Sequence, residues 1–126
     1  MIHDRHFTVA EANAALGWVR PRIETLRTAR NRLGDREAHA ALGDAAPTNG
    51  GGTHGKTIGQ GFLEVRRILG ELSAAGVLLR DLDRGLVDFP AMREGREVYL
   101  CWEFAEPRVG FWHELDAGFS GREPVD

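Results

Sequence analysis

The sequence predicts an α+β fold in which a long antiparallel helical hairpin packs on a four-stranded antiparallel β-meander. Three observations predict it. Apolar residues recur at intervals of three and four in two stretches before Gly76, which is the period of a helix. After Gly76 the period falls to two, which is the period of a strand. Short, turn-rich connections join these later stretches, so successive strands are expected to pair with each other.

A single domain is expected over residues 1–126. With 126 residues, of which 42% are hydrophobic, the chain is long enough to bury one core. The expected parts are a first helix within residues 1–33, a flexible glycine-rich loop over 34–57, a second helix over 58–75, the meander over 77–115 and an irregular tail over 116–126.

The first helix is predicted to begin after Thr8 and to cover residues 9–33. Thr8 and Glu11 are spaced as a capping box, in which each side chain accepts a hydrogen bond from the backbone N–H of the other residue. Apolar residues follow at helical spacing: Val9, Ala12, Leu16, Val19, Ile23, Leu26 and Leu33. Pro21 removes one backbone donor. Because the apolar seam keeps its phase across Pro21, one kinked helix is predicted.

The glycine-rich loop begins at Gly34. It is poor in apolar residues and contains three consecutive glycines at positions 50–52, so mobility is predicted for most of 43–56. The helical seam then resumes with Ile58, Phe62, Val65, Leu69 and Leu72. Gly76 supplies the residue that ends this second helix. Two helices joined by one loop predict an antiparallel hairpin.

Four strands are predicted over residues 77–82, 85–89, 96–104 and 109–115. The connections between them are rich in turn formers, namely Asp83-Arg84-Gly85, Arg93-Glu94-Gly95 and Ala105-Glu106-Pro107. The tail that follows contains glycines and a proline and is predicted to be irregular.

Charge and cysteine content narrow the functional classes. The net charge of −3 and the pI near 5.9 give no general positive field, so nucleic acid is not an expected partner. Arginines crowd the first helix, where a solvated face is preferred to a phosphate-binding one. One cysteine excludes an internal disulfide and a CxxC motif. No segment resembles a signal peptide or a membrane span, so a cytoplasmic protein without membrane association is expected.

Two blocks of the sequence resemble a known family. They are FTVAEANAAL with the VRP that follows it, and LRDLDRGLVDFPAMREGREVYLCWEFAEPRVGFWHELDAGFSGR. Together they cover about half of the chain, and they resemble the bacterial family named domain of unknown function 2203. Ala105-Glu106-Pro107 stands where the family has Gly-Glu-Pro. The family carries no known function, so the resemblance supports the architecture and transfers no catalytic residue.

His113 is the sharpest candidate for chemistry, because it stands where strand alternation calls for an apolar residue. We expect Tyr99, Cys101 and Trp112 on the sheet face away from the helices and His113 on the other face, although a register shift of one residue would bring His113 and Cys101 together. Two interpretations of His113 stay open. One is a core histidine bonded to a carboxylate or a carbonyl, and the other is a ligand or an acid–base group.

A divalent metal site is one hypothesis for this region, and a divalent metal is the one cofactor that the sequence suggests. The predicted ligands are His113, Asp116 and Glu103, which offer nitrogen and oxygen donors. Their spacing matches no established ligand signature.

A site for a small anionic ligand is the other hypothesis. The residues expected to bind the ligand are Trp102, Trp112, His113, Arg122 and Asp88. Asp88 lies in an apolar strand, where pairing with Arg80 or Arg96 is the structural alternative. Arg122 either clamps a carboxylate or phosphate, or pins the tail by a salt bridge. Cys101 has no adjacent base and is interpreted as a small buried hydrophobe.

Two functional classes follow. The favoured one is a non-enzymatic binding or assembly module, which forms a homodimer through its helices or binds a protein partner. The alternative is a metal or small-molecule site around His113, Asp116 and the acidic residues of the third strand, with catalysis left open. The sequence contains no P-loop, dinucleotide fingerprint, HExxH motif or nucleophile elbow, so no enzyme class is assigned.

Overall fold

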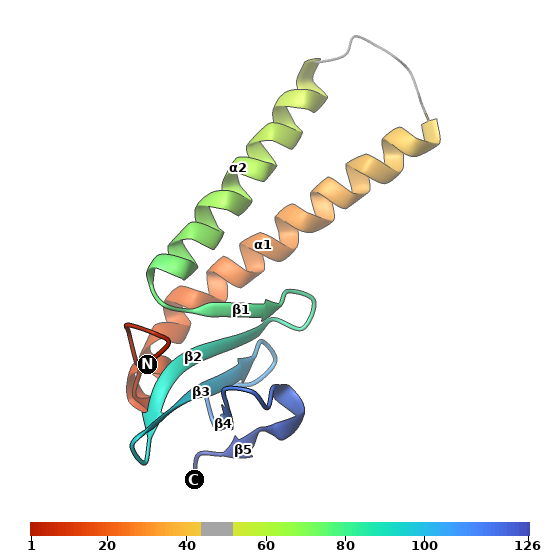
Figure 1. The fold of residues 1–126 in the computed structure, drawn as a ribbon. Coiled ribbons are helices and arrows are strands. Elements are labelled where there is room, and N and C mark those ends of the chain that lie inside the picture. Colours follow the sequence, from red (N-terminus) through yellow and green to blue (C-terminus); the bar gives the residue numbers. More distant parts are fainter. Residues whose placement is uncertain (44–51) are drawn as a thin grey trace.

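The computed structural model describes the backbone of residues 1–43 and 52–126 and the side chains of residues 1–32 and 61–126. Its elements are α1 (Val9–Gly43), α2 (Gly52–Ala74), β1 (Leu78–Asp81), β2 (Leu86–Arg93), β3 (Arg96–Glu103), β4 (Phe111–Glu114), the short 3-10 helix η1 (Phe119–Gly121) and β5 (Glu123–Pro124). The predicted α+β class is confirmed. Figure 1 shows a helical hairpin whose base, where α1 begins and α2 ends, lies beside the sheet.

Both helices are longer than predicted. α1 continues to Gly43 and α2 begins at Gly52, so the prediction of a loop over 34–57 is wrong at both ends. Good helix formers dominate the stretch DREAHAAL after Gly34, and they outweigh the cost of about 1 kcal/mol for one internal glycine. Within the predicted mobile stretch, residues 44–51 lie outside the described part of the chain. In the described ranges, neither helix has the apolar length that a membrane crossing needs.

The start of α1 is as predicted. The backbone N–H of Thr8 donates to Glu11 Oε1 at 2.8 Å, and the N–H of Glu11 donates to Thr8 Oγ1 at 3.0 Å. Pro21 stands inside α1 without ending it. Asn13 attaches the helix to the sheet, because its side-chain oxygen accepts the Val109 N–H at 2.8 Å and its amide donates to the Val109 carbonyl at 3.2 Å. These two bonds fix α1 against the segment that leads into β4.

The sheet has the order β1-β2-β3-β4-β5 and is antiparallel throughout. The predicted meander of four strands is therefore extended by a fifth, and the prediction of an irregular tail is wrong at Glu123–Pro124. Pro124 pairs with Phe111, and the backbone N–H of Val125 donates to Gly110 at 3.0 Å. A short strand containing proline is tolerated here because it forms the edge of the sheet, where no further strand needs the missing donor.

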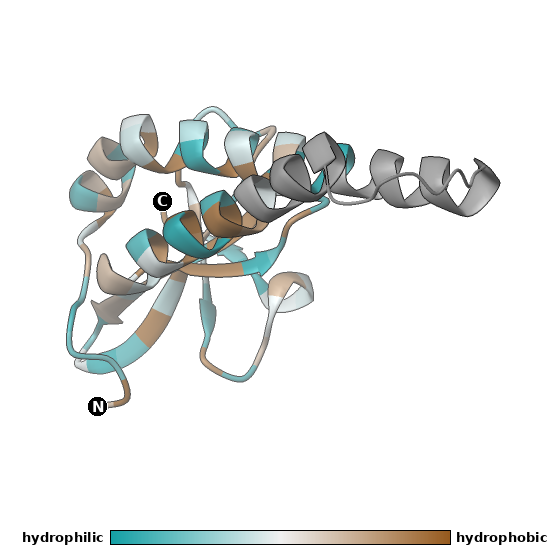
Figure 2. Cartoon of the chain, turned by 90° about the horizontal axis from the view of Figure 1, so that it is seen from above, coloured by the Kyte–Doolittle hydropathy of each residue, from teal (hydrophilic) through white to brown (hydrophobic). Residues whose placement is uncertain are grey.

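The core lies between the helices and one face of the sheet. Its fully buried members with the largest side chains include Trp102, Phe89, Ile23, Leu26, Ile68 and Leu72. Figure 2 shows apolar, brown residues gathered where the two layers meet. Trp102 and Trp112 both belong to this core, and the indole N–H of Trp102 donates to the carbonyl of Glu106 at 3.0 Å.

The arginines of α1 cross-link the fold. Each of four arginines donates to a group outside α1: Arg20, Arg22, Arg27 and Arg30. The acceptors are the backbone carbonyls of Phe104 and Leu82 and the carboxylates of Glu71 and Asp83. Guanidinium groups held in this way have fewer donors left for a phosphate. The predicted solvated face is wrong for Arg20, Arg22 and Arg27, which are half-buried and bonded to the rest of the fold.

Candidate metal centre

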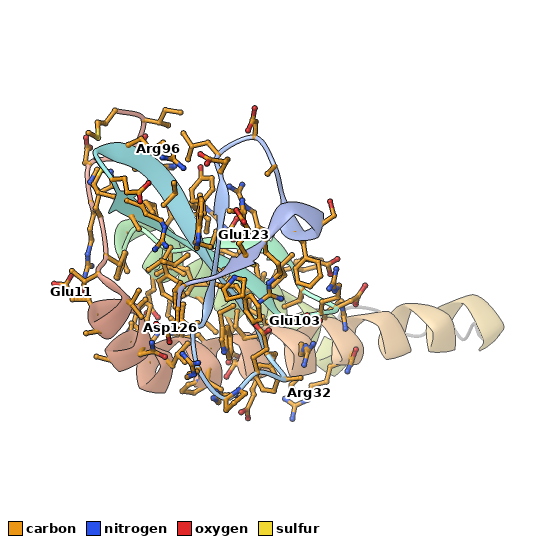
Figure 3. The ribbon with its side chains drawn as sticks, turned by 90° about the horizontal axis from the view of Figure 1, so that it is seen from below. Glu11, Arg32, Arg96, Glu103, Glu123 and Asp126 are labelled. Atoms are coloured by element: carbon orange, nitrogen blue, oxygen red, sulfur yellow. The ribbon has the colours of Figure 1, made fainter. Side chains whose placement is uncertain are left out.

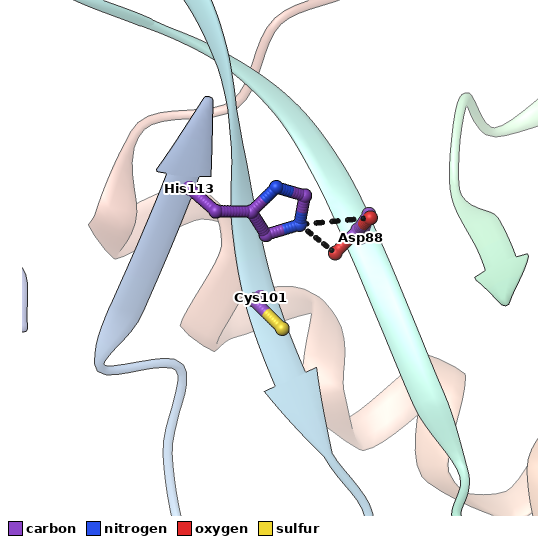
Figure 4. A group of neighbouring side chains, drawn as sticks. All are labelled: Asp88, Cys101 and His113. Atoms are coloured by element: carbon purple, nitrogen blue, oxygen red, sulfur yellow. Dashed lines mark hydrogen bonds and ion pairs between the residues drawn. The ribbon is translucent and has the colours of Figure 1, made fainter. Parts of the chain in front are cut away.

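Three reactive side chains meet on the sheet face opposite the helices. Asp88 on β2, Cys101 on β3 and His113 on β4 come from consecutive strands, and we call them the trio. Figure 4 shows the His113 ring reaching across β3 toward Asp88, with Cys101 beside them. One ligand atom of each lies within 4.8 Å of the other two. The exposed fractions are 3%, 0% and 3% in the order named, so the trio is internal.

The strand register explains why these residues meet. Asp88 is directly opposite Cys101 across β2 and β3, and His113 is directly opposite Tyr99 across β3 and β4. Tyr99 and Cys101 are two residues apart on β3 and therefore share one face. The three side chains consequently project from neighbouring positions on the same side of the sheet.

Both ring nitrogens of His113 are engaged. Nδ1 lies 2.7 Å from the carbonyl oxygen of Glu114, and Nε2 lies 3.1 Å from each carboxylate oxygen of Asp88. A carbonyl only accepts, so Nδ1 carries a hydrogen. A hydrogen bond between Nε2 and the Asp88 carboxylate also needs one hydrogen between the two groups, because an ionised carboxylate and a bare ring nitrogen can each only accept. The two side chains are therefore joined by a hydrogen bond in the interior of the chain.

Asp88 has a second partner toward the solvent. Arg80 Nε donates to Asp88 Oδ2 at 3.0 Å, so of the two arginines predicted as partners it is Arg80, from β1, that pairs with Asp88. The Arg80 side chain is 41% exposed, whereas that of Asp88 is 4% exposed. The Arg80 guanidinium also lies 4.9 Å from the centre of the Tyr99 ring. Arg80 therefore lies between the buried carboxylate and solvent.

Cys101 is a protonated thiol in this environment. Its burial, and after it the nearby Asp88 carboxylate, raise the pKa of the Cys101 thiol to about 12. A nucleophilic cysteine needs a base to form thiolate, and both nitrogens of His113 already have partners. The trio is therefore a set of metal-type donors, and it lacks the arrangement of a cysteine–histidine catalytic pair.

The first residues of the chain cover the same face beside the trio. The Glu97 carboxylate accepts the backbone N–H of Ile2 at 2.8 Å and that of His3 at 3.0 Å, and it lies 2.8 Å from His6 Nε2. These bonds, with the one from Ile2 contributing most, lower the pKa of Glu97 to about 2. His3 Nε2 lies 2.7 Å from the Tyr99 hydroxyl. The N-terminal segment is thus anchored over the outer face of β3.

The predicted faces of the fourth strand are wrong by one residue. Trp112 is opposite Leu100 and belongs to the core, whereas His113 is opposite Tyr99 and shares the face of Cys101. Tyr99, Cys101 and Trp112 are also all buried within the single chain, so none of them needs a second subunit or a ligand to cover it. Alternation defines the two faces of each strand but leaves the offset between strands undefined.

The other predicted metal ligands lie apart from the trio. Glu103 is at the opposite end of β3 from Arg96 (Figure 3), and its carboxylate accepts two hydrogen bonds from Arg84 at 3.2 Å each. Asp116 is exposed beyond the end of β4. Among the described residues, the cluster with metal-ligand geometry keeps His113 of the predicted set and lacks Glu103 and Asp116.

The five residues predicted to bind one small ligand are divided between the two faces of the sheet. Asp88 and His113 project from the outer face, where Arg122 of the tail also contacts Phe111, while the two tryptophans lie in the core. Arg122 adopts the tail-pinning alternative, because its terminal nitrogen donates to both carboxylate oxygens of Glu106 at 2.9 and 2.7 Å. Its guanidinium carbon lies 3.9 Å from the centre of the Phe111 ring, and Phe111 is directly opposite Cys101.

Cys101 is the site residue that sequence reasoning set aside. A usable signal was present, because each of three successive apolar strands carries one reactive side chain within it: Asp88, Cys101 and His113. In a meander, neighbouring strands bring such side chains within reach of each other when all of them project from the same face of the sheet. Residue periodicity alone does not tell whether the three side chains share a face.

Comparison with known proteins places the chain in a family. The family described as an uncharacterized conserved protein, DUF2203, matches residues 5–125. The chain belongs to this family. The resemblance to domain of unknown function 2203 is thus confirmed, and the whole trio falls inside the matched part of this DUF2203 protein. No curated protein and no solved structure matches the chain.

The departure from the expected DUF2203 pattern at Ala105 leaves the turn unstrained. Within the described residues, Glu94 is the one non-glycine residue with a positive φ, at 53°, and it forms a tight turn with Gly95. Ala105 therefore has an ordinary negative φ, which alanine adopts as readily as glycine.

Proposed function

We propose that this DUF2203 protein binds a divalent transition-metal ion, with zinc as the first candidate, through Asp88, Cys101 and His113. The observation that carries the proposal is the convergence of a carboxylate, a thiol and an imidazole within 4.8 Å of one another in the interior of the chain. Imidazole, thiolate and carboxylate are the donors that zinc takes from proteins. Buried ionisable groups are costly unless they are paired or bind a metal, and here Asp88 and His113 pair with each other in the same place where they would hold the ion.

The spacing of the donor atoms supports the proposal. Zinc lies roughly 2.0–2.2 Å from nitrogen and oxygen ligands, so two such ligands of a tetrahedral ion are separated by roughly 3.3 Å. His113 Nε2 and the Asp88 oxygens are 3.1 Å apart, which a small widening brings to that value. A thiolate ligand at roughly 2.3 Å from zinc lies roughly 3.5 Å from the other donors. The Cys101 sulfur already lies within 4.8 Å of them, so a small side-chain movement completes the contact.

The outer contacts of two ligands support it as well. The Nδ1–H of His113 is held by the Glu114 carbonyl at 2.7 Å, which leaves Nε2 for the ion. Oδ2 of Asp88 is held by Arg80 at 3.0 Å, which leaves Oδ1. Metal-binding histidines and carboxylates commonly have such partners, which orient them. Three protein ligands leave a fourth position for water or a small anion, and we place the proposed anionic ligand there.

Titration of metal-free protein with Zn²⁺ tests the proposal. Calorimetry in two buffers of different ionisation enthalpy is expected to show one bound ion and the release of about two protons. One proton comes from between Asp88 and His113, and the other comes from the Cys101 thiol. Co²⁺ in place of Zn²⁺ is expected to give a thiolate-to-metal charge-transfer band. Native mass spectrometry of protein purified without chelator shows whether the ion is retained.

Matched variants separate this site from adventitious binding. Cys101→Ala and His113→Gln should each weaken binding by more than the 10- to 100-fold that is typical of losing an outer-shell partner. His6→Gln is the control, because His6 is also bonded to a carboxylate, at 2.8 Å from Glu97, but lies outside the trio. Unchanged binding in both trio variants, or an equal loss in His6→Gln, would contradict the proposal.

We also propose that the chain self-associates as a homodimer in the cytoplasm. The specific observation is a pair of large apolar side chains left exposed two turns apart on α2, with Phe62 53% and Leu69 43% exposed. Residues seven apart lie on the same side of a helix, where they match the same seam of a second copy. Leu63, 64% exposed, extends the apolar surface. The cytoplasmic location is supported by the single free cysteine, which is buried.

Sedimentation equilibrium at micromolar concentration tests the dimer. The wild-type chain is expected to sediment as a dimer, and the double variant Phe62→Glu/Leu69→Glu is expected to sediment as a monomer, because two charges would have to be buried at the contact. Met92→Glu is the control, since Met92 is also apolar and 40% exposed but lies on β2. A wild-type mass of one chain would contradict the dimer and leave the metal proposal unaffected.

A further inference from the structure

The C-terminal tail carries a buried nitrogen without a partner. In the described part of the chain, Arg122 Nε is buried and has no hydrogen-bond partner. The Arg122 side chain is only 11% exposed, and its other end is fixed by Glu106 at 2.7 and 2.9 Å. The guanidinium carbon also lies 4.5 Å from the centre of the Phe119 ring. A buried N–H without an acceptor is costly and rare in folded proteins, so its presence calls for an explanation.

The position of this nitrogen relates it to Cys101. The Arg122 guanidinium stacks on Phe111, 3.9 Å from the ring centre, and Phe111 is the residue directly opposite Cys101 on the outer face. Arg122 is therefore the cation that the tail presents toward the sulfur side of the trio.

The three ligands differ in their outer contacts. His113 and Asp88 each have a partner, namely the Glu114 carbonyl and Arg80. Cys101 binds a metal as a thiolate, and a buried thiolate is an acceptor that needs a donor or a positive charge. The missing donor for the sulfur and the missing acceptor for Arg122 Nε lie on the same face of the sheet.

Resting on the proposed metal site, we infer that Arg122 is its third outer-shell residue, whose Nε–H donates to the Cys101 thiolate when a metal is bound. Arg122 is a positioning residue here, because it acts on the ion through the sulfur. Docking of the tail, residues 116–126, is thereby coupled to metal occupancy. The coupling is reciprocal. If the docked tail strengthens metal binding, the bound metal stabilises the docked tail by the same free energy.

Substitution of Arg122 by lysine tests the coupling, because lysine keeps the charge opposite Glu106 and lacks the Nε–H. Arg122→Lys is expected to weaken Zn²⁺ binding by about 10- to 100-fold and to move the Co²⁺–thiolate band to lower energy, since a hydrogen bond to sulfur stabilises its lone pairs. Zn²⁺ is expected to slow amide hydrogen exchange over residues 117–125 in the wild type and to do so much less in the variant. A structural role alone would leave the band in place.

Arg84→Gln is the matched control. Arg84 lies 4.0 Å from the centre of the same Phe119 ring and also binds a carboxylate, that of Glu103, but its Nε–H is already engaged, because it donates to Glu103 Oε1 at 3.2 Å. It should change Zn²⁺ affinity by less than about 3-fold, below the usual outer-shell effect. If Arg122→Lys does not fold, Glu106→Gln loosens the guanidinium while keeping an oxygen acceptor, and the same band shift is expected.

The outcomes are distinguishable. If the wild type binds Zn²⁺ and Arg122→Lys shows the same affinity and the same Co²⁺ band, the role of Arg122 is overturned and the metal site is unaffected. Absence of binding in the wild type overturns the metal site, and the role of Arg122 with it.

Discussion

Replacement of Asp88 by alanine is expected to lower the free energy of unfolding by about 3–5 kcal/mol, because removing one member of a buried charge pair leaves the other without compensation. The group left behind is His113, which is 3% exposed and whose Nε2 lies 3.1 Å from both Asp88 oxygens. Arg80 also loses its partner, but it is 41% exposed, so water replaces that bond at little cost.

Urea unfolding in the presence of chelator measures this difference. Asp116→Ala is the control, because Asp116 is an exposed carboxylate and its loss is expected to change stability by less than about 0.5 kcal/mol. The double variant Asp88→Leu/His113→Leu should recover much of the loss, since no unpaired group remains. It should nevertheless bind no metal. A loss below about 1 kcal/mol in Asp88→Ala would show that the pair contributes like an ordinary surface contact.

Alkylation of Cys101 is expected to be about a thousand times slower in the native protein than in the unfolded chain at pH 8. The pKa of the thiol rises from an ordinary 9.0 to about 12, because the group is buried and lies near the Asp88 carboxylate. At pH 8 the reactive thiolate is then roughly one part in ten thousand of the native protein and roughly one part in ten of the unfolded chain. As the pH rises from 9 toward 12, the native rate should keep increasing about tenfold per pH unit, while the unfolded rate levels off.

Iodoacetamide labelling followed by intact mass measures both rates, and a single adduct reports the reaction because the chain has one cysteine. Protein unfolded in urea is the reference. Added Zn²⁺ should slow native labelling further, because a metal-bound sulfur is a poorer nucleophile. Similar rates in native and unfolded protein would contradict the burial of the thiol and would return Cys101 to consideration as a nucleophile.

The helices were predictable in place but not in length. The apolar seam of α1 is buried at Val19, Ile23 and Leu26, because the face that packs on the sheet must be apolar. The capping box at Thr8 and Glu11 forms because two free backbone donors need acceptors close in sequence. The end of α1 and the start of α2 differ from the prediction, because an apolar seam marks only the part of a helix that packs against other elements. Backbone propensity carries a helix further.

The candidate site was predictable in part. His113 and Asp88 were recognised because each interrupts an apolar strand, and such positions need partners. Their partnership was not recognised, since they lie 25 residues apart in sequence and are separated in the sheet by β3. Glu103 and Asp116 lie close to His113 in the sequence, but in the fold Glu103 is bound by Arg84 and Asp116 is exposed.

The sequence by itself determined the class of fold, the order of the elements, the membership of the family and the unusual character of Asp88 and His113. Only the tertiary structure decided that His113 shares a face with Cys101, that Trp112 turns into the core and that the tail adds a fifth strand beside β4. The physical reason is that residue periodicity is a property of one strand, whereas the offset between strands is set by backbone hydrogen bonds and the path of the connecting chain. The candidate site takes one residue from each of three strands, so its geometry depends on the offset between β2 and β3 and on that between β3 and β4.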